Sequence, residues 1–119
     1  MSSPAVSVVV PTYQRPDYLR QTLQSILSQT WSDLEVLVVS DGPSEETESV
    51  VRELGDARLV SLSIPHHGWP APSRNAGIAR ARAEFIAFCD DDDLWERDKL
   101  EVQLAALHTK RAEIGRAHV

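Results

Sequence analysis

The sequence of 119 residues has a single cysteine and no long apolar run, and each shortage excludes a class of protein. Cys89 has no partner for an internal disulfide, and because it lies in an apolar segment we expect a thiol that packs like a small hydrophobic side chain. No apolar stretch approaches the about 20 residues of a membrane-spanning helix, so we expect no membrane segment in this chain. The first residues lack the basic and apolar regions of a secretory signal. The expected location is the cytoplasm, with residence at the inner face of the membrane left open.

Basic residues are also scarce relative to acidic ones. The chain has 12 Lys and Arg against 18 Asp and Glu, which gives a formal net charge of −6. Because nucleic-acid binding normally requires a basic face, we expect no nucleic-acid partner. The residues that are present, 42% hydrophobic and 25% charged, are ordinary for one globular domain.

Four short apolar or β-branched segments alternate with segments of helical periodicity. Strand composition and length are found at 6–10, 34–39, 58–64 and 85–89. Helical patterns are found at 17–30, 44–55, 72–83 and 97–112, with Pro16 ahead of the first and Ser44 placed to cap the second. Gly55 is placed to end that second helix.

This alternation predicts an α/β fold, a Rossmann-like, doubly wound and mostly parallel sheet with flanking helices. The first, second and fourth strand segments are almost continuously apolar, which is typical of strands covered on both faces. Ligands of such folds bind beyond the carboxyl ends of the strands, near the point where the strand order reverses. The sequence therefore predicts a site built from the segments that follow the strands, at 11–15, 40–43, 65–74 and 90–93.

Four consecutive carboxylates, Asp90 to Asp93, directly follow the last apolar segment. Carboxylates packed this closely repel one another unless a cation neutralises them, and hard ions such as Mg²⁺ and Mn²⁺ prefer oxygen ligands. Because Mg²⁺ typically takes one or two carboxylates and completes its shell with water and phosphate, the cluster favours a metal-diphosphate site. The alternative is a solvated acidic turn in which Asp93 caps the next helix.

Other polar residues at the strand ends are ambiguous on their own. Asp41 could accept hydrogen bonds from a base or a ribose, or could belong to an ordinary turn. Arg74, at the start of a helix, could bind an anion or form a surface ion pair. Tyr13 could pack on a planar base or within the protein. Adjacent His66 and His67 would point in different directions in an extended segment, so we do not expect them to share a metal.

Taken together, these segments resemble the family 2 glycosyltransferases of GT-A fold over residues 5–107. The motifs that carry the resemblance occur in uninterrupted order: VSVVVPTYQR at 6–15, QT at 29–30, VVSDG at 38–42, SRNAG at 73–77, and FCDDDD at 88–93 with Trp95 and KLE at 99–101. A serine at 40 and a proline at 43 depart from residues common in the family, and both are positions that bear on contacts with the base.

The resemblance implies a nucleotide-sugar-binding pocket and assigns residues to its nucleoside side. Pro11, Thr12 and Tyr13 correspond to the wall beside a uracil base, with Arg15 nearby. Asp41 corresponds to the acid that contacts the base.

The same resemblance implies a divalent metal cofactor, Mn²⁺ or Mg²⁺, on the diphosphate side. Asp90 and Asp92 correspond to the two ends of the family's DxD motif, with Asp92 as the direct metal ligand. Asp90 or Asp91 would make the ribose or second contact, and Arg74 would lie beneath the nucleotide.

By resemblance, the activity is inverting transfer of a sugar from a nucleotide-diphosphate sugar, with a UDP-sugar favoured, to an acceptor hydroxyl on a glycan, lipid or other acceptor, as in the biosynthesis of cell-surface glycans. Residues 1–113 would be the N-terminal, donor-binding half of the GT-A domain. The catalytic base is unknown and expected beyond the chain end, so we expect this chain alone to be inactive. Residues 114–119 read like a translated sequencing adapter and are expected to be a non-native tail.

Two other functions stay open at this point. A nucleotidyltransferase-like enzyme also combines acidic residues with Mg²⁺ on an α/β sheet, but it requires a glycine-rich phosphate loop after the first strand, where this chain has Pro11, Thr12 and Tyr13. The other is a non-catalytic nucleotide-binding module.

Overall fold

The computed structural model describes residues 3–114, with side chains described as far as residue 109. Strands and helices alternate as the sequence predicts, with bounds that differ by a few residues. The elements are β1 (Val6–Thr12), α1 (Pro16–Leu27), β2 (Leu34–Asp41), α2 (Glu45–Leu54), β3 (Leu59–Ile64), α3 (Ala71–Arg80), β4 (Phe85–Phe88) and α4 (Lys99–Ile114). Apart from Ile114, which ends α4, the expected non-native tail lies outside the described residues.

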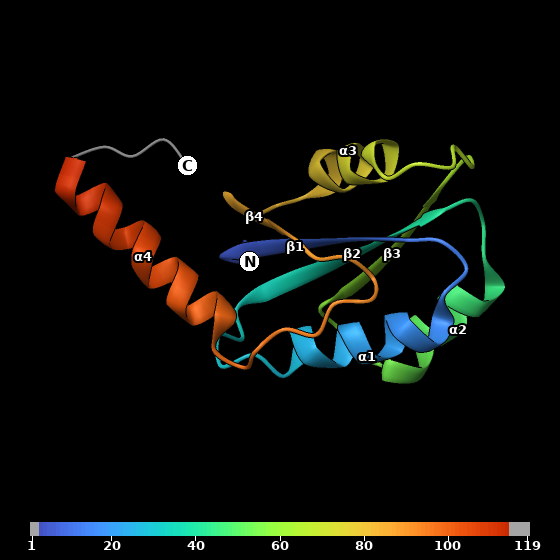
Figure 1. Ribbon diagram of the computed structural model, residues 1–119, viewed down its shortest axis with the longest axis horizontal. Helices are drawn as coiled ribbons and strands as arrows, with labels where there is room; N and C mark the ends of the chain where they lie inside the picture. Colours follow the sequence, from blue (N-terminus) through green and yellow to red (C-terminus); the bar gives the residue numbers. More distant parts are fainter. Residues whose placement is uncertain (1–2, 115–119) are drawn as a thin grey trace.

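The four strands of the described chain form one parallel sheet in the order β3-β2-β1-β4. The chain winds outward from β1 to β3 and then returns to the other side of β1 to form β4. The strand order therefore reverses between β1 and β4, which is the switch point where ligands bind in doubly wound folds. Figure 1 shows α1 and α2 on one face of the sheet and α3 on the other. The predicted doubly wound α/β class is confirmed.

Each face of the sheet has its own hydrophobic core, because successive strand residues point to opposite faces. Val8 and Val10 of β1 pack with Leu23 of α1 on one face. Val9, between them, packs with Leu37 and with Ala76 of α3 on the other face. The continuously apolar strands thus reflect burial on both faces, as expected.

Local sequence signals account for the starts of two helices and the end of one. Pro16 is the first residue of α1, where its missing N–H removes no hydrogen bond. The Ser44 side chain accepts a hydrogen bond from the N–H of Thr47 at 3.2 Å and caps α2. Gly55 ends that helix in the left-handed conformation, with φ of +60°.

The Gln29 side chain fixes where α4 begins. Its amide donates to the carbonyl of Glu96 at 2.6 Å and accepts from the N–H of Leu100 at 3.1 Å. Leu100 and Leu104 are buried against the sheet, whereas the C-terminal part of α4 extends away from it (Figure 1). Among residues 3–114, no helix is long and apolar enough to cross a bilayer.

The alternative in which Asp93 caps this last helix is wrong. The helix begins at Lys99, six residues later along the chain, and the N–H of Asp93 donates instead to the carbonyl of Asp90 at 3.1 Å. The four aspartates therefore form a separate turn between β4 and α4. The hydrogen bonds of Gln29 hold the following segment in place before the helix starts.

Candidate functional site

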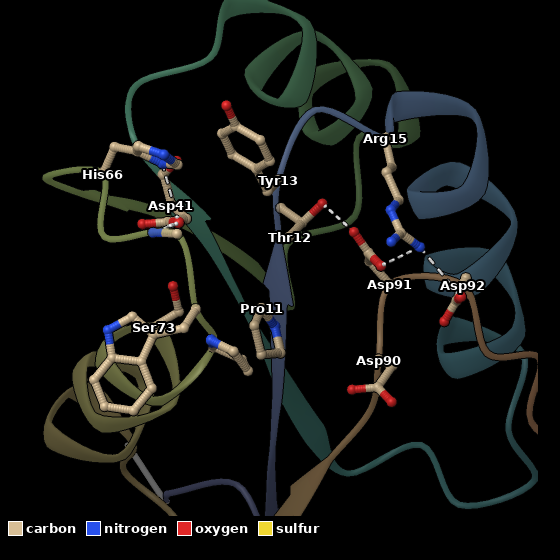
Figure 2. A pocket seen from close by; sticks show the side chains of 13 residues that line it. Pro11, Thr12, Tyr13, Arg15, Asp41, His66, Ser73, Asp90, Asp91 and Asp92 are labelled. Atoms are coloured by element: carbon tan, nitrogen blue, oxygen red, sulfur yellow. Dashed lines mark hydrogen bonds and ion pairs between the residues drawn. The ribbon is translucent and has the colours of Figure 1, made fainter.

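A cavity of about 550 Å³ opens beside the carboxyl ends of β1 and β2, between the aspartate turn and α3. Eight of the nine residues nominated from the sequence line it: Pro11, Thr12, Tyr13, Arg15, Asp41, Asp90, Asp91 and Asp92. Arg74 does not line the cavity, but its guanidinium lies 3.7 Å from the Asp90 carboxylate at the edge. Residues from segments far apart in the sequence thus meet at the predicted end of the sheet (Figure 2).

Asp91 has a structural role within the acidic edge of this cavity. Its carboxylate is almost buried and accepts a hydrogen bond from the Thr12 hydroxyl at 2.8 Å, while its backbone carbonyl accepts one from the Thr22 hydroxyl at 2.9 Å. The Arg15 guanidinium lies 3.6 Å from the same carboxylate (Figure 2). These contacts fix the aspartate turn against the end of β1 and the middle of α1.

Asp90 and Asp92 present accessible carboxylates at the same edge, with side chains 66% and 49% exposed. Arg15 donates to Asp92 at 3.2 Å, so it neutralises that carboxylate in the structure. Asp90 has a looser cationic neighbour in Arg74. This edge therefore offers carboxylate oxygens that can bind a cation and two guanidinium groups that can bind the anionic ligand of that cation.

The oxygen ligands at the acidic edge fit a hard divalent cation that is bound together with a phosphate group. Within the described part of the chain, no group of three or more His, Cys, Asp or Glu could hold a metal by itself. Two accessible carboxylates, Asp90 and Asp92, do supply the oxygen ligands that Mg²⁺ and Mn²⁺ favour, provided that phosphate and water complete the coordination shell. The residues fit a metal that arrives with a phosphate ligand.

Asp41, at the end of β2, lies on the opposite side of the cavity and is almost buried. One carboxylate oxygen accepts the N–H of His67 at 2.7 Å, and the other accepts the N–H of Gly68 at 2.9 Å. Burial opposes ionisation, but these two hydrogen bonds and the neighbouring imidazoles outweigh it and hold the pKa of Asp41 below its ordinary value of 3.8. Asp41 is therefore ionised at neutral pH and holds the segment after β3.

Aromatic side chains gather on this side of the cavity. The His66 ring stacks on the Tyr13 ring with centroids 4.7 Å apart, and its Nδ1 lies 3.1 Å from the Asp41 carboxylate. Trp69, also on the cavity wall, is 60% exposed. A planar ligand could pack against such surfaces.

Five lining residues were not nominated individually from the sequence: His66, Gly68, Trp69, Pro70 and Ser73. All five belong to the segment 65–74, which the sequence did predict to lie at this end of the sheet. For His66 and His67 the sequence predicts only that they do not share a metal. The signal that could have identified His66 is its position directly after β3, two strands away from Tyr13, but the stacking itself depends on how the loop folds back.

The chain matches the family model described as "Glycosyl transferase family 2" over residues 7–117. Among curated proteins, it is 34% identical over 103 residues to the putative teichuronic acid biosynthesis glycosyltransferase TuaG of Bacillus subtilis, covering 85% of this chain and 41% of TuaG. It is also 34% identical over 102 residues to WfgD of Escherichia coli, a UDP-Glc:alpha-D-GlcNAc-diphosphoundecaprenol beta-1,3-glucosyltransferase, covering 86% of this chain and 40% of WfgD. The chain thus spans about two fifths of the length of these relatives.

Solved structures share the fold over the same region. The crystal structure of S. aureus TarS 1-349 in complex with UDP superposes with a TM-score of 0.77 at 30% identity, covering 85% of this chain and 31% of that one. The mannosyltransferase PcManGT from Pyrobaculum calidifontis, in complex with GDP-Man and Mn²⁺, gives a TM-score of 0.73 at 29% identity, covering 84% of this chain and 31% of that one.

Proposed function

The chain belongs to glycosyl transferase family 2 and has the GT-A fold, and from this premise we propose that its cavity binds the nucleotide-sugar donor of an inverting, metal-dependent glycosyltransferase. One observation carries the proposal: accessible carboxylates on one side of a single cavity face aromatic side chains and Asp41 on the other. A nucleoside diphosphate has the matching polarity, with phosphates that bind metal at one end and a planar base at the other. The cavity of about 550 Å³ is also within the range of typical small-molecule sites.

Asp92 and Asp90 would hold the divalent cation, Mn²⁺ or Mg²⁺, together with the donor diphosphate. Such a cation offsets the negative charge that develops on a departing nucleoside diphosphate. Arg15 pairs with Asp92 in the structure and lies close enough to exchange this partner for a phosphate oxygen. Arg74, beside Asp90, would add positive charge beneath the nucleotide.

The nucleoside would occupy the other end, between the close of β1 and the segment after β3. Pro11 and Thr12, at the end of β1, and Tyr13, just after it, form one wall, and Asp41 lies beyond them. We favour uridine as the nucleoside. A UDP complex of the structural relative TarS supports this choice, and GDP-Man bound to PcManGT marks the competing possibility.

Residues 1–113 would therefore supply donor binding and leaving-group stabilisation for a longer enzyme that acts on a cell-surface glycan or its lipid precursor. TuaG and WfgD, named for teichuronic acid biosynthesis and for a diphosphoundecaprenol acceptor, support that context. We nominate no residue of this chain as the general base that activates the acceptor hydroxyl. We propose that this general base belongs to a region that corresponds to the part of TuaG and WfgD that this chain does not match, about three fifths of their length. This chain alone should therefore transfer no sugar.

Calorimetric titration of UDP into the purified chain, with and without Mn²⁺, tests the proposal. Asp92→Asn removes one charge from the nominated metal ligand, and Asp93→Asn is the matched control in the same turn, since Asp93 does not line the cavity. Loss of one charged contact predicts affinity weaker by about 10- to 100-fold for Asp92→Asn in the presence of Mn²⁺. The Asp93→Asn variant should bind as the wild type does.

Two results would contradict the proposal. One is a folded wild-type chain that binds neither UDP nor GDP in the presence of Mn²⁺. The other is nucleotide binding that Mn²⁺ does not strengthen and that both asparagine variants retain, which would support the non-catalytic nucleotide-binding module instead.

A further inference from the structure

The most exposed aromatic side chain of the cavity wall is that of Trp69. Among the described residues, eight large apolar or aromatic side chains are well exposed, and isolated exposure of this kind is ordinary at a protein surface. Only two of the eight, Tyr13 and Trp69, line the cavity between the aspartate turn and α3. Trp69 is the larger of the two and the more exposed, at 60% against 46%. It therefore offers a ligand in this cavity an extensive apolar surface.

The Trp69 ring has no partner within the described part of the protein. It stacks on no other ring, and its indole N–H makes no hydrogen bond among the described side chains. The Tyr13 ring, by contrast, has His66 on one face, with centroids 4.7 Å apart. Trp31 and Trp95 pack against the hydrophobic core on the α1 side of the sheet. The indole of Trp69 is therefore available to a ligand.

The backbone on both sides of Trp69 is fixed, so the side chain is presented from a defined place. Before it, Gly68 has φ of +86°, which L side chains rarely adopt, and its N–H donates to the Asp41 carboxylate at 2.9 Å. After it, Pro70 is the N-cap of α3, and its carbonyl accepts the N–H of Arg74 at 3.0 Å. A residue that precedes proline is itself restricted to extended conformations. Little backbone entropy is then lost when a ligand packs on this side chain.

The position of Trp69 in the chain assigns it to the base end of the cavity. It directly follows Gly68, which is bonded to Asp41. Asp41 lies across the cavity from the accessible carboxylates of Asp90 and Asp92 (Figure 2). A nucleoside diphosphate whose phosphates lie at those carboxylates therefore has its base at the Asp41 end. An indole is a suitable platform for a base because stacking requires only a planar face.

We propose that the indole of Trp69 stacks on the nucleobase of the donor and supplies much of the affinity for the nucleoside. This assignment rests on the proposed function, since that function places a nucleoside diphosphate in the cavity. It concerns the flat face of the base and leaves the polar edge of the base to Asp41. Because every base has a planar face, Trp69 should strengthen the binding of UDP and of GDP alike.

Calorimetric titration of UDP, GDP and inorganic pyrophosphate, each with Mn²⁺, compares the wild type with Trp69→Ala and Trp69→Phe. Loss of the stacking face predicts that Trp69→Ala binds whichever nucleotide the wild type binds about 10- to 100-fold more weakly. Trp69→Phe keeps an aromatic face and should bind within about fivefold of the wild type. Pyrophosphate has no base, so its affinity should be the same in all three proteins.

Tyr18→Ala is the matched control for the loss of an exposed ring. Tyr18 lies in α1, is 59% exposed and does not line the cavity. Its substitution removes an aromatic side chain of nearly equal exposure from another part of the surface. Nucleotide and pyrophosphate binding should therefore match the wild type.

Tryptophan fluorescence reports on the contact itself. Stacking on a base should quench Trp69, so saturation with the preferred nucleotide and Mn²⁺ should lower the emission of the wild type, whereas pyrophosphate and Mn²⁺ should not. In Trp69→Phe, which still binds the nucleotide, this decrease should be absent. The remaining tryptophans, Trp31 and Trp95, pack against the core and do not line the cavity.

The outcomes separate this inference from the proposed function. Nucleotide affinity of wild-type strength in Trp69→Ala, or an equal loss of pyrophosphate affinity, would overturn the role of Trp69 while donor binding still stands. A fluorescence decrease that Trp69→Phe retains would overturn it too. A wild type that binds neither UDP nor GDP in the presence of Mn²⁺ would overturn the proposed function, and this inference with it.

Discussion

At the scale of single residues, the buried Glu35 ties the amino-terminal ends of the strands to the segment after α3. Its carboxylate accepts hydrogen bonds from the Ser7 hydroxyl and from the backbone N–H and guanidinium of Arg82. Burial alone would raise the pKa of Glu35, but these hydrogen bonds and the charge of Arg82 outweigh burial and lower it from the ordinary value of 4.5. The ionised form is therefore the one that stabilises the fold.

We expect Glu35→Gln to lower the free energy of unfolding by about 1–3 kcal/mol at pH 7, because it removes the charge and leaves buried donors poorly matched. A group with a lowered pKa in the folded state stabilises above its unfolded value and loses that contribution as pH falls through its folded value. The difference between the wild type and the variant should therefore persist down to about pH 4.5 and shrink below it. Urea denaturation at a series of pH values measures this.

Glu53→Gln is the matched control for this prediction. Glu53 pairs with Arg20 at the surface, where both side chains are well exposed, so its loss should change stability by less than about 1 kcal/mol. Equal effects of the two substitutions, or a Glu35→Gln effect that grows in acid, would contradict the account of Glu35.

Cys89 should be inert toward thiol reagents in the folded protein. It is 2% exposed within the core, and burial, with the nearby charges of Asp93 and Asp90, raises the pKa of Cys89 to about 12. Because the thiolate is the reactive form, a chromogenic disulfide at pH 8 should react completely in denaturing urea and without measurable rate in buffer. Rapid reaction of the native protein would show that the end of β4 opens.

Sequence reasoning identified most of the residues around the cavity but not their contacts. The position of a residue at the end of a strand is enough to predict that Thr12, Asp41 and Asp91 line one site, since parallel strands end at one edge. It does not show that Thr12 donates to Asp91 or that Asp41 holds His67 and Gly68. Those contacts depend on loop backbone conformations, which local composition does not determine.

At the scale of elements, the packing of α3 on the sheet depends on Gly77. A Cβ atom at this position would overlap the Val9 side chain at the centre of the sheet. Ala76 and Gly77, both small, allow α3 to lie this close to the sheet.

We expect Gly77→Ala to lower the free energy of unfolding by about 1–3 kcal/mol despite the higher helix propensity of alanine, because it overpacks the core. Denaturation midpoints measure the change. Ile78→Ala, at a position 43% exposed on the same helix, should change stability by less than about 1 kcal/mol. A Gly77→Ala protein as stable as the wild type would mean that α3 can shift away from β1 without loss.

The start of α4 marks a limit of prediction from local signals. Asp93 followed by Glu96 has the spacing of a helix cap, but the helix starts at Lys99 because Gln29 holds the segment before it through hydrogen bonds to Glu96 and Leu100. The interaction links residues about 70 positions apart, as Gln29 and Leu100 show. Ser44 and Gly55, whose signals act within their own helix, were predicted correctly.

At the scale of the whole molecule, the order β3-β2-β1-β4 brings the ends of β1 and β2 and the turn after β4 to one edge, beside the first turn of α3. The sheet topology follows from strand-helix alternation and right-handed connections, so the location of the site could be predicted before its geometry. The central claim is that one nucleoside diphosphate spans this edge, with its diphosphate at the aspartate turn and its base at the segment after β3.

Amide hydrogen exchange of the chain saturated with UDP and Mn²⁺, compared with the free chain, tests that claim most directly. The account predicts slower exchange in three separate segments at once, 11–15, 66–70 and 90–92, while α2 (Glu45–Leu54), on the other face of the sheet, exchanges unchanged. Protection that omits either 66–70 or 90–92 in a chain shown by calorimetry to be saturated would contradict it, because the ligand would not span the cavity.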